Sequence, residues 1–373
     1  MALTLPKIKI SLPSFGRLTL PGRGGPPLAL GLDIGSHAVK VCELHRLTRG
    51  YRLLTLGSSL MPPDATEDGA LTDAEAVAGV ISPLLANLKS KNRKVAISVS
   101  GYSVIVKKIN LQVMSTEELE KHIVEEAEQY IPFDIDDVYL DFHDLQTNRE
   151  GDENTDVMLV AAKKELVDGY LDLLEGLGLQ TVVVDVDAFA LENAFAAGEP
   201  RVTTENVALV DIGAGKMNIN LLSGGSSALT RDVTLGGRDL TIQLQNALGL
   251  SFDEAEDLKT GKTPAPTEEL QQKAVGVVQD TCRQWSEEIK RAIAFYMSTN
   301  EEHPISRIVI SGGSARITGL ADYLAHQCEL PCSVFNPFAR TEYDPLKIDP
   351  KYLQAAAPEM GQAFGLATRS VEF

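Results

Sequence analysis

Residues 30–41 read Leu30-Gly31-Leu32-Asp33-Ile34-Gly35-Ser36-His37-Ala38-Val39-Lys40-Val41, and this stretch decides the fold. An echo follows well downstream, Leu209-Val210-Asp211-Ile212-Gly213-Ala214-Gly215-Lys216-Met217-Asn218-Ile219. Each copy is an apolar strand that ends in Asp-Ile-Gly and then turns back, so we expect two β-hairpins. The repetition indicates an internal duplication whose two halves close on one nucleotide.

The residues at the two turns suit the polyphosphate of a nucleotide with a bound metal ion. Asp33 and Asp211 come at strand ends, where a carboxylate can hold a hydrated Mg²⁺. Glycines such as Gly35 and Gly213 let backbone amides approach an anion with no Cβ in the way. The sequence therefore predicts phosphates and Mg²⁺ between the two turns.

A third glycine turn follows a β-branched strand at Ile308-Val309-Ile310-Ser311-Gly312-Gly313-Ser314-Ala315-Arg316-Ile317. We expect a helix directly after it, from Leu320 to His326. A strand that opens into a glycine turn and a helix is a common way to receive a nucleoside. In this order the three elements resemble the phosphate-1, phosphate-2 and adenosine motifs of the actin, Hsp70 and sugar-kinase superfamily. The resemblance implies a duplicated, ribonuclease H-like α/β fold that binds ATP or ADP.

The composition is that of an ordinary globular chain. Its 373 residues are 44% hydrophobic and 23% charged, which suits two to three domains of roughly 100–200 residues each. The net charge of −18 argues against nucleic acid as a partner, because such binding depends on Lys and Arg. With no secretory signal and no apolar run of about 18 residues or more, we expect a cytoplasmic protein.

Neither the N-terminal segment nor the cysteines predict a site. Residues 1–27 are rich in Pro and Gly and should form a flexible lead-in. Their basic residues could touch an anionic membrane surface, but we favour an unstructured tail. The four cysteines, Cys42, Cys282, Cys328 and Cys332, are too scattered for disulfides or a zinc site, so we expect buried thiols.

Between the two phosphate hairpins we predict an inserted α/β subdomain over residues 107–180. Ser115 and Glu118 have capping-box spacing, so a helix should start there, run to Tyr130 and be stopped by Pro132. The elements expected next are the strands Val138–Leu145 and Val157–Ala162, a helix Lys164–Leu177, and a strand Thr181–Val186 that returns to the core.

The two actin-like halves are expected on either side of this insert. The first half should comprise residues 28–106 and 181–200, and the second residues 201–373, with the final helix packing back on the first half. The elements expected in the first half are the strands Tyr51–Leu60, Lys94–Val99 and Val104–Ile109, and a helix Asp73–Leu88 with Thr72 as its N-cap.

Three runs in the insert resemble one family specifically. They are Met114-Ser115-Thr116-Glu117-Glu118-Leu119-Glu120, Glu126-Ala127-Glu128-Gln129-Tyr130-Ile131-Pro132-Phe133 and Leu159-Val160-Ala161-Ala162-Lys163-Lys164-Glu165. These runs are similar to those of the PilM family of type IV pilus assembly. The likeness to that family extends from about Leu28 to the C-terminus. That family has a fold similar to the cell-division protein FtsA, so the resemblance implies an actin-like ATPase fold with an FtsA-type 1C insert.

The resemblance also implies a role. It suggests a cytoplasmic ATP-binding scaffold, peripheral to the inner membrane through partners, that docks the short N-terminal cytoplasmic peptide of PilN. Through PilN and PilO it would link the motor to the envelope complex, with the pilus motor ATPases or PilC as further contacts. A helix stop with core-facing aromatics explains Tyr130-Ile131-Pro132-Phe133 just as well as a docking role.

Matching the superfamily motifs assigns the nucleotide site residue by residue. Asp33 and Asp211 would lie near Mg²⁺, Lys40 would contact a phosphate, and the first turn would offer amides from Gly35, Ser36 and His37. A solvated strand end is the alternative for Lys40. The rest of the implied site comprises Gly213 and Gly215 in the second turn, Gly236, Gly237, Glu256 and Lys259 on the adenosine side, and Gly312, Gly313 and Ser314 in the third turn. Glu256 and Lys259 could bind the ribose or form an exposed ion pair.

Lys216 departs from the Hsp70-like pattern, which favours a small hydroxyl residue at this position. The lysine could reach toward a γ-phosphate or point into solvent. We therefore expect ATP binding with weak or no ATPase activity, and assign no catalytic residue.

Two alternatives belong to other functional classes. One is an FtsA-like filament-forming ATPase that attaches itself to a membrane, but the C-terminal residues read as the final helix of the fold with no basic amphipathic appendage. The other is a sugar or small-molecule kinase, for which Asp185 or Asp187 could supply the acid. No substrate pocket for a kinase is evident in the sequence.

Overall fold

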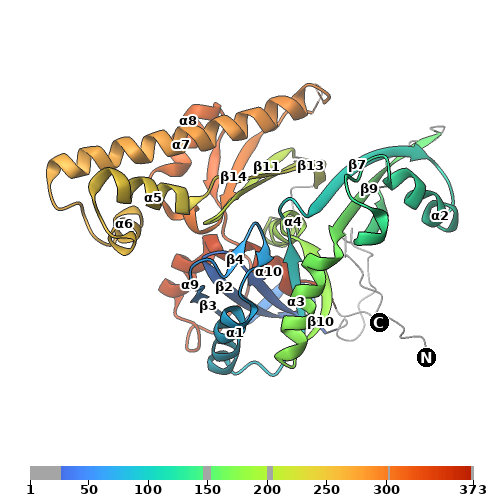
Figure 1. The fold of residues 1–373 in the computed structure, drawn as a ribbon, viewed down its shortest axis with the longest axis horizontal. Helices are drawn as coiled ribbons and strands as arrows, with labels where there is room; N and C mark the ends of the chain where they lie inside the picture. Colours follow the sequence, from blue (N-terminus) through green and yellow to red (C-terminus); the bar gives the residue numbers. More distant parts are fainter. Residues whose placement is uncertain (1–26, 146–152, 200–204, 301–302, 371–373) are drawn as a thin grey trace.

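The computed structural model describes residues 27–145, 153–199, 205–300 and 303–370 (Figure 1). The predicted lead-in, apart from Pro27, and most of the loop between the second and third strands of the insert lie outside these ranges. Two five-stranded sheets and one three-stranded sheet form the frame of the molecule, together with a two-stranded β4–β5 pair (Thr66–Glu67, Ala70–Leu71).

The two large sheets have the same topology, which confirms the predicted duplication. In the first sheet the strand order is β10-β6-β1-β2-β3, and in the second it is β13-β12-β11-β14-β15. Each contains an antiparallel meander of three strands and two further strands that run parallel to its first strand. The strands of the first sheet are β1 (Leu30–Ile34), β2 (Ala38–Arg46), β3 (Tyr51–Leu60), β6 (Lys94–Val99) and β10 (Gln180–Val186). Those of the second are β11 (Val207–Ile212), β12 (Met217–Ser223), β13 (Ser226–Val233), β14 (Arg307–Ser311) and β15 (Cys332–Val334).

The two Asp-Ile-Gly hairpins close in the same way. Gly35 N–H donates to Ala38 O at 3.1 Å, and Gly213 N–H donates to Lys216 O at 2.9 Å. These bonds place Asp33 and Asp211 at equivalent ends of β1 and β11.

Helices cover the sheets. The first half contributes α1 (Ala74–Leu88), α3 (Lys164–Gly176) and α4 (Asp187–Gly198), and the second contributes α5 (Gly237–Leu248), α6 (Phe252–Lys259), α7 (Glu268–Met297) and α8 (Leu320–Cys328). The chain ends through α9 (Pro350–Ala356) and α10 (Gly361–Ala367). In Figure 1, α7 runs along the outer edge of the second half and α1 lies at the far end of the first.

The N-cap of α1 is Asp73, so the prediction of Thr72 was wrong. The Asp73 carboxylate accepts from Ala76 N–H at 2.9 Å. The Thr72 hydroxyl instead donates to Asp64 O. The Thr72 side chain therefore bonds to a neighbouring loop and not to the helix. The sequence spacing does not indicate this contact.

The insert is a three-stranded sheet with one helix packed on it. Its strand order is β7-β9-β8, with β7 (Val104–Gln112), β8 (Val138–Asp144) and β9 (Asn154–Lys163), and α2 spans Thr116–Ala127. The predicted capping box is confirmed, because Ser115 N–H donates to Glu118 Oε2 at 3.0 Å and Ser115 Oγ accepts from Glu118 N–H at 3.3 Å. The helix ends at Ala127 rather than Tyr130, since Tyr130 and Ile131 N–H both turn back to Ala127 O.

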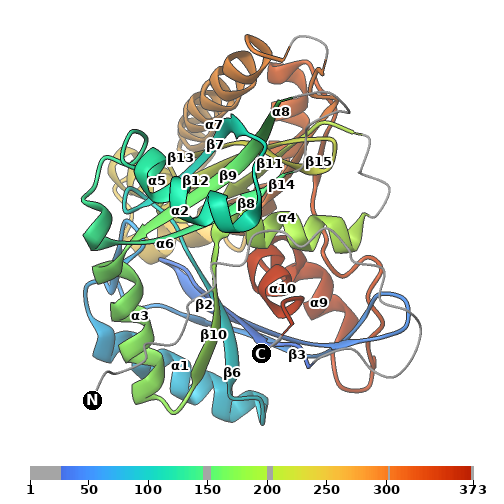
Figure 2. The same cartoon turned by 90° about the vertical axis from the view of Figure 1, so that its right-hand side faces the viewer.

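Helix α3, which falls within the predicted limits of the insert, packs against the first sheet. Its apolar residues Leu166, Val167, Tyr170, Leu173 and Leu174 join the core of β1, β2, β6 and α1. The insert has a separate small core around Ile123, Leu159 and Ala161. Figure 2 shows the insert's sheet above β10, with α3 beside the lower sheet.

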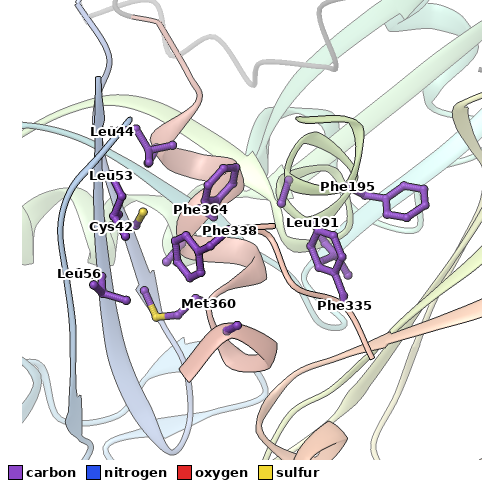
Figure 3. Close-up of a cluster of buried hydrophobic side chains, with 14 of the residues drawn as sticks. Cys42, Leu44, Leu53, Leu56, Leu191, Phe195, Phe335, Phe338, Met360 and Phe364 are labelled. Carbon is purple, nitrogen blue, oxygen red and sulfur yellow. The ribbon is translucent and has the colours of Figure 1, made fainter. Parts of the chain in front are cut away.

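A third core joins the two halves (Figure 3). It contains Cys42, Leu44, Leu53 and Leu56 from β2 and β3, Leu191 and Phe195 from α4, Phe335 and Phe338 from the segment after β15, and Met360 and Phe364 from the C-terminal region. The last helix, α10, lies directly against α4. A Cβ at Gly365 would stand 1.7 Å from Ala190 O, so only glycine permits this approach. All four cysteines are free thiols.

Candidate functional site

A cavity of about 430 Å³ opens between the two halves. This volume is within the roughly 300–1,000 Å³ of small-molecule sites. Most of the predicted site residues line it, namely Asp33, Gly35, Ser36, His37, Lys40, Asp211, Gly213, Gly215, Glu256, Lys259, Gly312, Gly313 and Ser314. The three motifs are therefore brought to one place.

The first hairpin supplies an ion pair at the cavity wall. Lys40 Nζ lies 2.9 Å from Asp33 Oδ2, because Asp33 and Lys40 are partners in the β1–β2 register. Lys40 is therefore not a solvated strand end. Burial raises the pKa of Asp33, and Lys40 offsets only part of this rise. His37 is exposed at the turn, where its carbonyl accepts from Met61 N–H at 2.8 Å.

The second hairpin presents a carboxylate in a poorly hydrated position. Burial raises the pKa of Asp211 to about 6, with opposing effects from Lys40 and a hydrogen bond from Ser311. A cation placed beside Asp211 would therefore favour its charged form.

The two hairpins touch each other across the cavity. Gly215 N–H in the second hairpin donates to Ser36 Oγ in the first at 3.2 Å. The Arg238 guanidinium donates to Ser36 O at 3.2 Å. The turns of the two hairpins therefore meet at the cavity.

Lys216 points into the cavity and not into solvent. Its ammonium lies 3.1 Å from Asp187 Oδ2 and donates to Ser100 Oγ, and Ser100 in turn donates to Asp187. Burial opposes ionisation of Asp187, but Lys216 and the serine hydroxyls outweigh it and lower the pKa of this carboxyl. Burial likewise opposes the charge on Lys216, and Asp187 and Asp232 raise its pKa above the ordinary value.

Asp185, unlike Asp187, forms a buried ion pair with Arg369. It is fully buried and accepts from Arg369 Nε at 2.7 Å. The suggestion that Asp185 could act on a substrate is therefore wrong, and of the two candidates only Asp187 lines the cavity.

The adenosine side is organised by Lys259. Its ammonium lies 2.7 Å from Glu256, donates to Gly237 O at 3.1 Å and donates to Thr241 Oγ1 at 2.9 Å. The Lys259 side chain is 9% exposed. Glu256 and Lys259 therefore form a partly buried ion pair and not the exposed ion pair of the sequence alternatives.

The predicted glycines lie at two different depths. Gly312 has φ +91°, and a Cβ there would stand 2.5 Å from Ile212 O, so the third turn packs directly on the second hairpin. Gly236 and Gly237 lie behind the cavity wall: Gly237 N–H donates to Gly213 O at 2.9 Å, and a Cβ at Gly236 would stand 2.1 Å from Ala214 O. They support the second hairpin, and we correct their assignment as lining residues.

The residues present fit a Mg²⁺ that arrives with a triphosphate. Asp33 and Asp211 face the same cavity, and the described part of the chain has no group of three His, Cys, Asp or Glu residues that could hold an ion by themselves. Mg²⁺ is usually held by one or two carboxylates together with phosphates and water. The donor set therefore suits a metal–nucleotide complex and not a resident structural ion.

Several lining residues were not assigned to the site from the sequence. Ser100, Tyr170, Arg316 and Glu359 all line the cavity, as do residues 66–69 of the β4–β5 pair. Arg316 follows the third glycine turn directly, so its position was a usable signal. The others come from parts of the chain with no nucleotide motif.

The comparisons with known proteins decide the family. The model for the type IV pilus assembly protein PilM matches residues 31–371. The chain belongs to the PilM family of type IV pilus assembly proteins. A solved chain from a PilM–PilN type IV pilus biogenesis complex is 30% identical, with a TM-score of 0.83 over 94% of this chain and 100% of that chain.

More distant relatives agree on the fold. The cell division protein FtsA of Bacillus subtilis (strain 168) is 23% identical over 255 residues, which are 62% of this chain but only 57% of FtsA. The ethanolamine utilization protein EutJ from Carboxydothermus hydrogenoformans has a TM-score of 0.55 at 14% identity, over 92% of this chain and 90% of EutJ. The predicted PilM resemblance and actin-like fold are thus confirmed.

Over the described residues, no helix has both the length and the apolar content that crossing a bilayer requires.

Proposed function

We propose that this PilM-family protein is an ATP-binding scaffold of the type IV pilus inner-membrane assembly platform, which docks the N-terminal cytoplasmic peptide of PilN. The observation that carries the nucleotide part is that both Asp-Ile-Gly hairpins and the third glycine turn line the same cavity.

The cavity offers what a triphosphate needs. Lys40 and Lys216 supply positive charge, the turns of Gly35 and Gly213 supply amides, and Asp33 and Asp211 would hold the hydrated Mg²⁺. Glu256 and Lys259 would face the nucleoside. A nucleotide held by both halves would favour one closure between them, because a ligand shifts a population toward the state that binds it better.

We propose weak or no ATPase activity. Asp187 is the candidate general base for activating a water molecule. Lys216 and Ser100 already bind its carboxylate, however, and its pKa is lowered. A carboxylate held by these partners is a weaker base than a free one, and general bases typically contribute about 10²–10⁴ in rate.

The peptide part of the proposal uses two sheet edges near the insert. In the described part of the chain, β8 pairs with β9 alone and β10 pairs with β6 alone. An extended peptide could add there as a strand, taking affinity from main-chain hydrogen bonds and specificity from side-chain pockets. The similarity to a solved chain from a PilM–PilN complex supports this role.

Isothermal titration calorimetry with Mg-ATP tests the nucleotide part. Asp33→Ala and Asp211→Ala should each weaken binding by about tenfold or more, since each removes a ligand for the hydrated metal. Asp280→Ala is the control, because Asp280 forms an exposed ion pair with Arg283 on α7. Wild-type affinity in both cavity variants would move the site elsewhere.

A further inference from the structure

The second hairpin carries a cation that reaches across to the other half. Lys216 comes from the β11–β12 turn, whereas Ser100 follows β6 and Asp187 opens α4. The ammonium contacts both of them. The contact therefore ties a phosphate hairpin of one half to the first helical residue of the other.

This cation is held within the cavity wall. The Lys216 side chain is 25% exposed and that of Asp187 is 13% exposed, and both residues line the cavity. A charge so withdrawn from water is costly unless it is paired. Nine acidic residues line the same cavity against five lysines and arginines, so its carboxylates, among them Asp33, Asp187 and Asp211, would repel an incoming polyphosphate. Lys40 offsets the charge of Asp33, and Lys216 offsets that of Asp187.

Lys259 and Lys216 contact different parts of the cavity wall. Lys259 donates to Gly237 O of α5, and Gly237 N–H bonds to Gly213 O in the second hairpin. Lys216 contacts Ser100 of the first half, which lies beside Gly69, and Tyr170 donates to Gly69 O at 2.7 Å. A nucleotide with its nucleoside near Glu256 and Lys259, and with its phosphates extending toward the first half, would bring its last phosphate to Lys216.

We propose that Lys216 reads the terminal phosphate and makes the site prefer ATP over ADP, an inference that rests on the proposed nucleotide-binding function. An ammonium has three donors, so Lys216 can contact a phosphate oxygen while it stays bound to Asp187 and Ser100. ADP ends one phosphate earlier and lacks this contact. A charge-assisted hydrogen bond of this kind corresponds to about 10- to 100-fold in affinity.

Calorimetry of ATP and of ADP, each with Mg²⁺, tests the proposal on the full chain. The wild type should bind ATP about 10- to 100-fold more tightly than ADP. Lys216→Met keeps the length of the side chain and removes its charge, so it should bring the two affinities to within about threefold, mainly by weakening ATP. Lys347→Met is the control, because Lys347 is 75% exposed and its ion pair with Asp344 is remote from the cavity lining.

A second variant separates the loss of the phosphate contact from the cost of leaving Asp187 without its cation. Lys216→Met leaves Asp187 buried without its cation, so the double variant Lys216→Met/Asp187→Asn removes both charges and should show the same loss of preference. A purely structural link between the halves would lower both affinities equally, and that result would overturn the proposal. So would an unchanged preference for ATP in both variants. A wild type that binds both nucleotides equally removes this inference alone, whereas one that binds neither also removes the proposed function.

Discussion

Several charged residues of the cavity form ion pairs, and the sequence indicated only the Glu256–Lys259 pair, as one of two alternatives. Asp33 and Lys40 face each other because a tight hairpin sets their register, whereas we expected Lys40 to contact a phosphate or to lie at a solvated strand end. Lys216 finds Asp187 and Ser100 across the interface between the halves. Their arrangement depends on tertiary packing that no local pattern contains.

Asp185 and Asp187 show the same limit. Two residues apart at the end of a strand, they could not be separated by sequence. Helix α4 begins at Asp187 and turns its carboxylate to the cavity, whereas Asp185 binds Arg369 from the end of the chain. The partner lies 184 residues away.

Glu192 provides a stability test at the scale of one residue. This α4 side chain is 3% exposed and close to Asn220, whose Nδ2 lies 3.5 Å from its Oε2. Burial raises its pKa from 4.5 to about 8. The folded state therefore holds this proton more tightly than the unfolded state, so the free energy of unfolding falls as pH rises from about 4.5 to about 8.

Glu192→Gln should remove that loss of stability. We expect the variant to exceed the wild type by on the order of 3–5 kcal/mol at pH 9, and to differ little at pH 4. Urea unfolding at the two pH values measures the difference. Glu287→Gln, at an exposed position of α7, is the control. An equal offset between Glu192→Gln and the wild type at both pH values would show that ionisation of Glu192 is not responsible.

At the scale of elements, sequence patterns located the strands well and the helix ends poorly. The strands Tyr51–Leu60 and Lys94–Val99 match the prediction residue for residue, because alternation and apolar runs mark them. Helix boundaries depend on which nearby group takes a cap, as Asp73 and Thr72 show. The assignment of α3 to the first half depends on which core its apolar face meets, and its own pattern does not specify this.

Packing between α10 and α4 should be unusually sensitive to one methyl group. Gly365→Ala would press a Cβ against Ala190 O in the backbone of α4, so α10 must move. We expect a loss of about 3 kcal/mol in unfolding free energy. Gly169→Ala in α3 is the matched control, because a Cβ there meets nothing within 4 Å. A helix-interior Gly→Ala change should stabilise by about 0.5–1 kcal/mol.

Chemical denaturation of both glycine variants beside the wild type measures these changes. Similar stabilities for the two variants would mean that α10 does not approach α4 as closely as described.

At the scale of the whole molecule, the duplication is visible in both sequence and topology. Two Asp-Ile-Gly hairpins predicted two halves, and the matching strand orders bear this out. The core that joins the halves was not predictable, since it combines β2, β3, α4 and the C-terminal helices from opposite ends of the chain (Figure 3). The predicted limits of the halves and the insert stay predictions.

The insert should be required for peptide docking. A synthetic peptide from the PilN cytoplasmic N-terminus should bind the full chain in fluorescence anisotropy, and deletion of residues 107–163 should abolish binding while calorimetry still detects Mg-ATP. If both proteins bound the peptide equally, the insert would have no part in its site.

Backbone methylation of the peptide tests the strand-addition mode without altering the protein. A strand bonds to its neighbour through every second residue. N-methylation at one alternating set should therefore weaken binding strongly, and at the other set little. Equal losses from both sets would contradict docking at a sheet edge.

The central claim is that one cavity between the two halves holds ATP. A crystal structure of the full chain with ATP, Mg²⁺ and the PilN peptide tests it most directly. We predict triphosphate density between the turns of Gly35 and Gly213, with the last phosphate beside Lys216 and the nucleoside beside Lys259. An empty cavity at saturating ATP, or nucleotide bound elsewhere, would contradict the account.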